Sequence, residues 1–227
     1  MRYMDILIKY ILNLTVVLLL SIISVIAYFS FNLPDDSILK NYKPNVMTRV
    51  HTSDGDLIKE YSREYRIFIP IDDIPDNLKN AFISAEDKKF YNHIGIDVVG
   101  IIRAFVKNIS NLMNDKRPEG ASTITQQVAK NFLLSDELSI SRKIKEALLA
   151  LKIEKTLSKD RILELYLNQI YLGSGTYGVA AASNKYFQKT LSELTFPEVA
   201  FLAALPKAPS RYNPSKNYEL AFERRNW

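Results

Sequence analysis

The segment with the clearest chemical potential begins with two adjacent acids, Glu86 and Asp87. They follow an apolar stretch, Leu78 to Ala85, whose apolar side chains recur at three- and four-residue steps. This spacing predicts a core-facing helix with the acid pair in its last turns. The negative end of a helix dipole raises the pKa of a carboxyl group there, and a carboxylate in that setting can act as a base. A solvated acidic helix end that stops at Gly95 would explain the same residues.

A second segment, Gly120 to Asn131, is unusually polar for a stretch between two apolar helical patterns. It contains several hydroxyl groups, the adjacent amides Gln126 and Gln127, and Lys130. Together these groups can hydrogen-bond a sugar or a phosphate. A Ser- and Thr-rich helix start is also a common structural feature, so both interpretations remain open at this point.

A third segment, Arg142 to Ala147, holds a compact group of charges. Helical geometry places Arg142 and Glu146 one turn apart, with Lys145 adjacent. The following residues, 148 to 153, are apolar on most of the helix circumference, which predicts that this helix is buried. A glutamate in a buried helix needs a partner or a function. The alternative is an exposed intrahelical ion pair, worth only about 0.3–0.5 kcal/mol.

The N-terminal region predicts a membrane anchor. The stretch Tyr10–Phe31 has no charged residue and would span about 33 Å as a helix at about 1.5 Å per residue. A cleavable signal peptide is the competing interpretation, with Val25–Ala27 as a cleavage site, but the stretch exceeds a typical signal core. Arg2 and Lys9 precede the span and Asp35–Asp36 follows it, so the N-terminus is predicted to stay cytoplasmic.

Composition limits the rest of the chain. Of the 227 residues, 47% are hydrophobic and 24% charged, which is typical of a folded protein rather than a disordered one. Cysteine is absent, which excludes a disulfide framework, thiolate catalysis and a thiolate metal site. The net charge of +5 is spread along the chain. Anionic lipid or phosphate-bearing ligands fit this charge, although a solvated surface fits almost as well.

The order of patterns predicts the organisation of the chain. The turn signal Asp54-Gly55 lies between apolar runs and predicts a small β hairpin. From Pro75 onward the pattern is helical, with a helix capped at Ser158 that continues to Gly173 and a capping box at Thr195. The last residues resemble the opening of another helix, so the natural protein is expected to continue. The predicted parts are a cytoplasmic tail (1–9), an anchor (10–31), a linker with the hairpin (32–74) and one catalytic domain (75–227).

Taken together, the three segments resemble the peptidoglycan glycosyltransferase domain, glycosyltransferase family 51. This domain is found in class A penicillin-binding proteins and in monofunctional cell-wall polymerases. The resemblance runs from about Val46 to the chain end, and the motifs occur in family order. They are Glu-Asp-x-x-Phe-x-x-His-x-Gly at 86–95, Gly-x-Ser-Thr-Ile-Thr-Gln-Gln-x-x-Lys-Asn at 120–131, Arg-Lys-x-x-Glu at 142–146, and two weaker segments at 159–173 and 178–187.

The resemblance implies a mainly α fold with a lysozyme-like glycosyltransferase lobe, a membrane-associated small lobe, a short β hairpin and the N-terminal transmembrane helix. It also implies an activity. The domain would polymerise lipid II into peptidoglycan glycan strands outside the bacterial cytoplasmic membrane, by inverting glycosyl transfer with release of undecaprenyl pyrophosphate. The region 101–113 resembles the family's membrane-dipping segment, although an ordinary amphipathic core helix would look similar.

Roles carried over from the family fall on specific residues. Glu86 would be the general base that takes the proton from the acceptor 4-hydroxyl. Glu146 would be the second essential carboxylate and would orient the cations or help to hold a divalent metal, Mg or Mn, at the pyrophosphate. Arg103, Lys130 and Lys145 would contact the phosphates. The other expected substrate-binding residues are Ser122, Thr123, Gln126, Gln127, Asn131, Arg142, Asn168 and Tyr171. Leu138 departs from the family, where a basic residue is usual.

Two other functions compete with the glycosyltransferase interpretation. A glycan-cleaving enzyme shares the lysozyme-like lobe but has no use for a pyrophosphate cluster. An anchored scaffold that only binds glycan or lipid II would have no need of Glu86. The segment Val50–Ile74 is closer to class A penicillin-binding proteins, so a transpeptidase domain is predicted beyond Trp227. Expected partners are lipid II, the growing strand, membrane lipid and the cell-wall synthesis, division and elongation proteins. Nucleic acid is not an expected partner.

Overall fold

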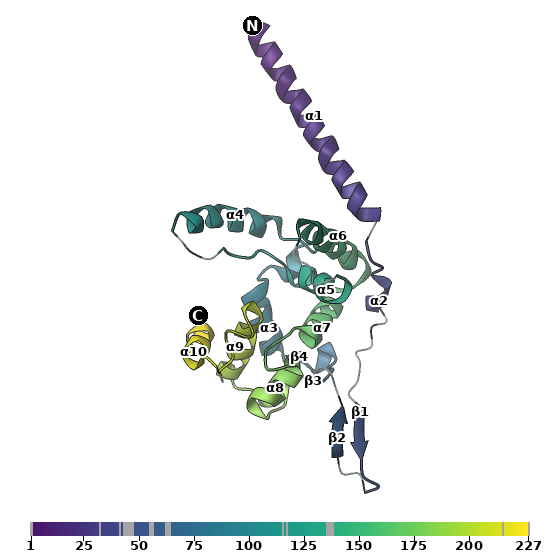
Figure 1. The fold of residues 1–227 in the computed structure, drawn as a ribbon, viewed down its shortest axis with the longest axis vertical. Helices are drawn as coiled ribbons and strands as arrows, with labels where there is room; N and C mark the ends of the chain where they lie inside the picture. The colour runs from purple at the N-terminus through teal and green to yellow at the C-terminus, as the bar shows by residue number, and fades with distance from the viewer. Residues whose placement is uncertain are drawn as a thin grey trace.

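The protein is described by a computed structural model over residues 2–31, 33–40, 42, 48–54, 57–61, 65–114, 116, 118–134, 139–214 and 216–226. Figure 1 shows one long helix followed by a helical body with very little strand, which confirms the predicted mainly α class. The helices are α1 (Arg2–Phe31), α2 (Ser37–Lys40), α3 (Asp76–Glu86), α4 (Val98–Met113), α5 (Ile124–Leu133), α6 (Ile140–Thr156), α7 (Lys159–Gln169), α8 (Val179–Phe187), α9 (Phe196–Ala204) and α10 (Tyr218–Asn226). Short 3-10 turns lie at Ile71–Asp73, Phe90–Asn92, Leu191–Glu193 and Leu205–Lys207.

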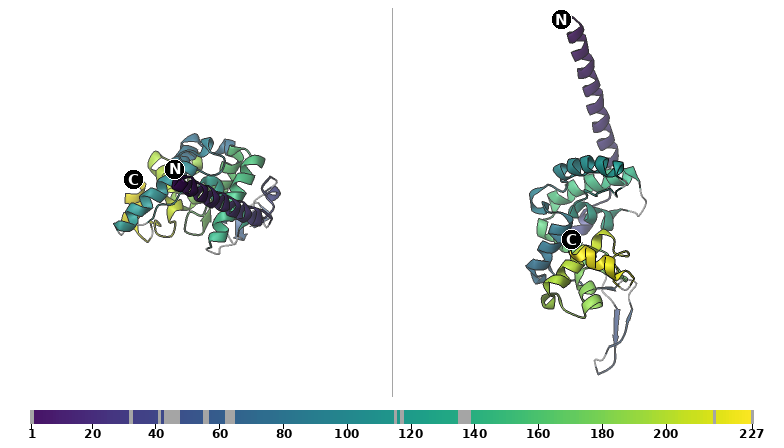
Figure 2. Two further views of the ribbon diagram at one scale, coloured as in Figure 1. Left: turned by 90° about the horizontal axis from the view of Figure 1, so that it is seen from above. Right: turned by 90° about the vertical axis from the view of Figure 1, so that its left-hand side faces the viewer.

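Helix α1 stands apart from the body (Figures 1 and 2). Its segment Ile8–Phe31 is long and apolar enough to cross a membrane, and none of its most apolar stretch is buried inside the protein. The segment matches the predicted anchor to within two residues at its start. Helices α4 and α6 lie on the side of the body nearest α1, whereas the hairpin lies at the opposite end (Figure 1).

A short segment, residues 33–40, connects the end of α1 to the body and is called the strap below. The Asp36 carboxylate is buried and contacts Lys152 Nζ at 2.7 Å and the Thr156 hydroxyl at 3.0 Å, both on α6. Burial alone would raise the pKa of the Asp36 carboxyl group, but these two hydrogen bonds outweigh it and hold the pKa below its ordinary value. Leu39 on α2 is fully buried in the core. The strap therefore fixes where α1 leaves the helical body.

The predicted β hairpin is present. Strands β1 (Thr48–His51) and β2 (Leu57–Tyr61) pair antiparallel, with an irregularity between Val50 and His51. Asp54 of the turn signal is described, whereas Gly55 lies outside the described residues. A second, minimal sheet pairs β3 (Tyr65–Arg66) in parallel with β4 (Thr176–Tyr177), which brings the linker beside the segment that follows α7.

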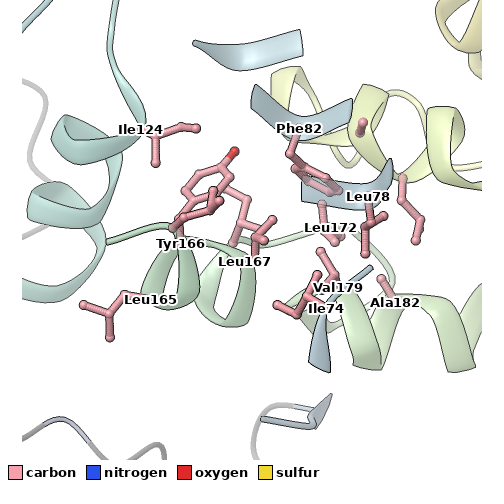
Figure 3. Close-up of a cluster of buried hydrophobic side chains, with 14 of the residues drawn as sticks. Ile74, Leu78, Phe82, Ile124, Leu165, Tyr166, Leu167, Leu172, Val179 and Ala182 are labelled. Carbon is pink, nitrogen blue, oxygen red and sulfur yellow. The ribbon is translucent and has the colours of Figure 1, made fainter. Parts of the chain in front are cut away.

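The core forms around α7, because seven successive residues of this helix, Ile162 to Asn168, are buried. Helix α5 packs against α6 and α7, and α3 packs against α9. Figure 3 shows Leu165, Tyr166 and Leu167 of α7 among apolar side chains from the other helices. Ser158 caps α7 as predicted, since its Oγ accepts from the Arg161 N–H at 3.2 Å.

Helix α7 ends earlier than the sequence predicted. Its last residue is Gln169, and the chain then forms a bridge between Tyr171 and Tyr177 instead of continuing to Gly173. Gly173, with φ +87°, lies in the turn that makes this bridge possible, because its carbonyl accepts from the Thr176 N–H at 2.9 Å. The glycine therefore marks the following turn and not the helix end.

Gly95 belongs to the loop that follows α3, and it lies very close to the backbone of α6. Its φ is +100°, and a Cβ built there would lie 2.7 Å from the Ala150 carbonyl oxygen. Only glycine combines this backbone conformation with this close approach. The loop that carries the first acidic motif is therefore seated directly on the backbone of α6.

We expect Gly95→Ala to lower the free energy of unfolding by about 2 kcal/mol or more, because it adds backbone strain and a steric overlap. The corresponding fall in Tm is about 4–8 °C for a body of this size, measured by circular dichroism in detergent. Gly120→Ala is the matched control, because no atom lies within 4 Å of a Cβ there and its φ is not positive. Equal Tm values for the two variants would contradict this account of the loop.

Candidate functional site

Glu86 is the last residue of α3 and is half-buried. Its Oε2 accepts a hydrogen bond of 2.9 Å from Nε2 of Gln127 on α5. Burial raises the pKa of the Glu86 carboxyl group above its ordinary value, and the negative charge of Asp87 raises it slightly further. The Gln127 hydrogen bond lowers the pKa in part, but the net direction is upward. A half-buried carboxylate with one protein hydrogen bond can accept a proton from a bound ligand.

Positive charges near Glu86 come from the far end of the chain. Lys207, in the turn after α9, and Arg224 on α10 both lower the pKa of the Glu86 carboxyl group electrostatically. The packing of α3 against α9 and of α9 against α10 brings them there. Sequence analysis did not identify either residue, because they lie more than a hundred positions after Glu86 and no local pattern links them to it.

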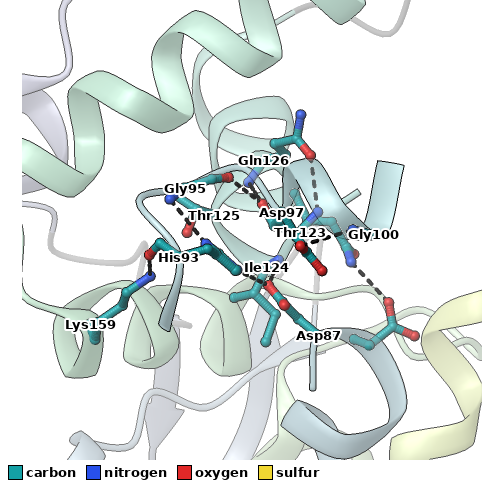
Figure 4. A network of polar contacts seen from close by, with 12 residues as sticks. Asp87, His93, Gly95, Asp97, Gly100, Thr123, Ile124, Thr125, Gln126 and Lys159 are labelled. Carbon is teal, nitrogen blue, oxygen red and sulfur yellow. Dashed lines mark hydrogen bonds and ion pairs between the residues drawn. The ribbon is translucent and has the colours of Figure 1, made fainter. Parts of the chain in front are cut away.

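The neighbouring acid Asp87 has a different role, because it is buried and one of its oxygens is shared by two protein groups. Its Oδ2 accepts from the Ile124 backbone N–H at 3.0 Å and contacts Nε2 of His93 at 2.9 Å (Figure 4). The other ring nitrogen of His93, Nδ1, accepts from the Gly95 N–H at 3.0 Å. These partners place a proton on Nε2, which donates to Asp87. Asp87 thus joins the end of α3, the loop after it and the first turn of α5.

Thr123 and Gln126 form a buried capping box at the start of α5. The Thr123 hydroxyl donates to the Gly95 carbonyl at 2.6 Å and accepts from the Gln126 N–H at 3.1 Å, while Gln126 Oε1 accepts from the Thr123 N–H. Both were predicted to bind substrate. In the structure their side chains begin a helix, because a buried helix start must satisfy its free N–H groups. Their contact with substrate stays a prediction.

Glu146 is the centre of a charged cluster on the buried side of α6. The residue is 3% exposed, and its two oxygens contact Arg142 Nε at 3.3 Å and Lys143 Nζ at 2.6 Å. Lys143 Nζ also donates to the Ser122 hydroxyl at 2.7 Å. A carboxylate between two cations holds their positively charged ends in place, and such a pair suits a phosphate ligand.

Lys143, and not the predicted Lys145, is the lysine of this cluster. Within the part of the chain that the structure describes, Lys145 forms no ion pair. A spacing of three residues along a helix pairs side chains as well as a spacing of four, so Lys143 and Glu146 could have been paired from the sequence. The motif Arg-Lys-x-x-Glu includes Lys143, and the prediction overlooked it.

Helix α5 connects the two acidic centres. Gln127 contacts Glu86, and Ser122, just before the helix, contacts the lysine beside Glu146. Lys130 and Asn131 are exposed near the C-terminal end of the same helix. The structure therefore gathers the residues predicted from the second segment around one short helix.

Three predicted residues lie elsewhere. Arg103 is on α4, 70% exposed, with its guanidinium 4.0 Å from the Asp97 carboxylate. The side-chain amide of Asn168 accepts from the Ile69 N–H and donates to the Ile69 carbonyl, at 2.8 Å each, so it holds the preceding segment against α7. Tyr171 packs against Tyr177 with ring centroids 5.0 Å apart. Leu138, the departure from the family pattern, lies outside the described residues.

Tyr166 is a buried polar group that the sequence pattern did not single out. Within the described part of the chain its hydroxyl has no hydrogen-bond partner. Burial raises the pKa of this hydroxyl well above its ordinary value, and the charges of Glu86 and Asp87 raise it further. The ring packs edge-on against Phe82 of α3 (Figure 3), so Tyr166 fixes the helix that ends in Glu86.

The residues around Glu146 do not make a metal site by themselves. Within the described ranges no three acidic or histidine side chains converge as metal ligands, and both oxygens of Glu146 are paired with cations. A hard divalent cation needs several oxygen ligands, which this side-chain set does not supply. The predicted metal at Glu146 stays a prediction, and no step below depends on it.

The family described as Transglycosylase matches residues 54–227. Penicillin-binding protein 1A of Rickettsia bellii is 56% identical over 203 residues, 89% of this chain and 26% of that protein. Penicillin-binding protein 1A of Neisseria flavescens is 55% identical over 83% of this chain and 23% of that protein. The chain thus spans about a quarter of the length of these relatives.

A solved structure was also found. The crystal structure of penicillin-binding protein 1A from Haemophilus influenzae is 29% identical and matches 82% of this chain and 18% of that chain, with a TM-score of 0.41.

We expect Asp87→Ala to destabilise the body by about 2–5 kcal/mol, because it leaves two buried donors, Ile124 N–H and His93 Nε2, without an acceptor. Hydrogen exchange at the Ile124 amide should accelerate in step with the loss measured by chemical denaturation. Asp72→Ala, at an exposed aspartate, is the control and should change neither quantity. Unchanged protection of Ile124 in the Asp87 variant would show that this carboxylate does not hold α5.

Proposed function

The chain belongs to the transglycosylase family, and on that premise we propose that it polymerises lipid II into peptidoglycan glycan strands with release of undecaprenyl pyrophosphate. The observation that carries the proposal is the environment of Glu86. This carboxylate is half-buried, has a raised pKa and accepts a hydrogen bond from Gln127 of α5. Ser122, just before the same helix, contacts Lys143 in the cation cluster around Glu146. A base and a group of cations that contact one short helix match a reaction in which a hydroxyl attacks a sugar that leaves a pyrophosphate.

Glu86 takes the proton from the acceptor 4-hydroxyl as the hydroxyl oxygen attacks the anomeric carbon of the donor. The bond from that carbon to the pyrophosphate oxygen breaks, and the electron pair leaves with the pyrophosphate. One displacement inverts the anomeric configuration. The raised pKa of Glu86 helps this step, because a carboxylate with a higher pKa is a stronger base at the same position.

Arg142 and Lys143 stabilise the negative charge that develops on the leaving pyrophosphate. Glu146 acts through them, since its buried carboxylate contacts both cations and fixes their orientation. This arrangement makes Glu146 a positioning residue. Lys130 and Arg103, both exposed, are the further cations that a long phosphate-bearing lipid would meet.

The membrane side of the enzyme is formed by α4. Its exposed apolar residues include Phe105 (66% exposed), Leu112 and Met113 (both 81%). Helix α4 also lies on the side of the body that faces α1 (Figure 1), so these side chains can enter the lipid while the anchor crosses it. This geometry supports a membrane-associated lobe through which the lipid tail of the substrate reaches the site.

We place the protein in a bacterial cytoplasmic membrane, crossed once by α1 with the N-terminus inside and the body outside. The charge asymmetry around the span supports this orientation. The transpeptidase domain beyond Trp227 and the contacts with cell-wall synthesis, division and elongation proteins stay predictions.

We expect the full chain in detergent to convert labelled lipid II into long lysozyme-sensitive glycan, with a divalent metal present. Glu86→Gln should lower the initial rate at least about 100-fold, because loss of a general base costs about two to four orders of magnitude. Glu219→Gln, at an exposed glutamate on α10, is the matched control and should retain the parent rate.

The length distribution of the products distinguishes a polymerase from a glycan-cleaving enzyme and from a binding scaffold. Shortening of preformed glycan by the parent would favour a glycan-cleaving enzyme. Binding of lipid II without polymer, equal in the parent and the Glu86 variant, would favour a scaffold.

The pH dependence of the polymerisation rate should reflect the ionisation of Glu86. Because the ionised form is the base, the rate rises as pH increases through the raised pKa of Glu86. Gln127→Ala removes a hydrogen bond that lowers this pKa, so the acidic limb of the rate profile should move to higher pH. Asn80→Ala, at an exposed residue of α3, should leave the limb in place. A shift of the limb to lower pH in the Gln127 variant would contradict the assignment of Glu86.

A further inference from the structure

An open cavity of about 400 Å³ lies between the end of α1 and the outer face of α6. This volume is within the usual range for small-ligand sites, about 300–1,000 Å³. Three polar and three apolar side chains line it. The lining residues are Ser30, Leu33, Leu148, Leu151, Lys152 and Lys155.

The four α6 residues of the cavity form one face of the helix. Leu151, Lys152 and Lys155 follow Leu148 by three, four and seven positions, so the four side chains lie on one stripe of the helix. Glu146, Leu149 and Ile153 are buried on the other side of the same helix. The cavity is therefore separate from the Glu146 cluster, although both are built on α6.

Both charged residues that line the cavity are lysines. Lys152 is paired with Asp36 at 2.7 Å and also feels the negative charge of Asp35, which is not a lining residue and accepts hydrogen bonds from Ser37. Lys155 forms no ion pair with any described residue. An anionic ligand would therefore meet Lys155 without displacing an existing partner.

The cavity lies where the membrane span ends. Ser30 is in the last turn of α1, and the apolar segment stops at Phe31. In the proposed crossing, this level is that of the lipid phosphates at the outer surface of the membrane. Leu148 and Leu151 are half-exposed on the stripe that faces α1, so an acyl chain can cover them.

We propose that this cavity binds the headgroup of an anionic phospholipid, with the phosphodiester against Lys155, Lys152 and the Ser30 hydroxyl. The acyl chains then pack along α1 and over Leu148 and Leu151. One bound lipid bridges the anchor and α6, next to the contact that Asp36 makes with the same helix. This inference rests on the proposed membrane crossing but not on the polymerisation of lipid II.

Native mass spectrometry of the full chain in mild detergent tests the proposal, with phosphatidylglycerol and phosphatidylcholine titrated separately. We expect tighter binding of phosphatidylglycerol. Lys155→Gln should weaken that binding about five-fold and Lys152→Gln/Lys155→Gln more, since each lysine near a lipid surface contributes a factor of this size. Lys185→Gln, at an exposed lysine of α8 on the far side of the body, should change nothing.

Three results would overturn the proposal. The first is equal affinity for the two lipids, and the second is an equal loss in the Lys185 variant. The third is displacement of phosphatidylglycerol by excess inorganic phosphate, which would show that the cavity takes free phosphate and needs no lipid. Polymerisation of lipid II, measured in parallel, distinguishes failure of this site from failure of the proposed enzyme, because lipid binding does not require turnover.

Discussion

The buried carboxylate of Asp87 is the constraint on which the site depends. A buried carboxylate is stable only when hydrogen bonds replace its lost water, and here the donors are the Ile124 N–H and His93 Nε2. One donor begins α5 and the other belongs to the loop that ends at Gly95. The requirement to satisfy a single charge thus brings three segments of the chain to one point.

Helix α5 carries this constraint to both acidic centres. Its capping box, built from Thr123 and Gln126, bonds to the Gly95 carbonyl and so sets its starting point. With the start fixed, Gln127 meets Glu86, and Ser122 meets Lys143 beside Glu146. The buried Thr123 and Gln126 therefore make the start of the helix, and the half-buried Ser122 and Gln127 contact the two acidic centres.

Three carboxylates of the site have three different environments. Asp87 is satisfied by neutral donors, Glu146 by two cations, and Glu86 by one amide hydrogen bond and partial burial. The environment of Glu86 raises the pKa of its carboxyl group, and the single protein hydrogen bond leaves the group able to accept a proton from a ligand. Helix α6 connects this site to α1, because Glu146 lies on its buried face while Lys152 and Lys155 lie on the face toward α1.

The sequence by itself determined the elements whose signals are local. The anchor, the hairpin, the helix that ends in Glu86 and the caps at Ser158 and Thr195 follow from periodicity and from residues a few positions apart. The motifs also determined the family. Tertiary structure alone decided which polar residues became structural, as with Thr123, Gln126 and Asn168, because burial of a hydrogen-bonding group depends on distant segments. It also brought Lys207 and Arg224 toward Glu86 through the packing of α3, α9 and α10. Long-range electrostatics and burial have no signature in local spacing, so these features could be known only from the folded chain.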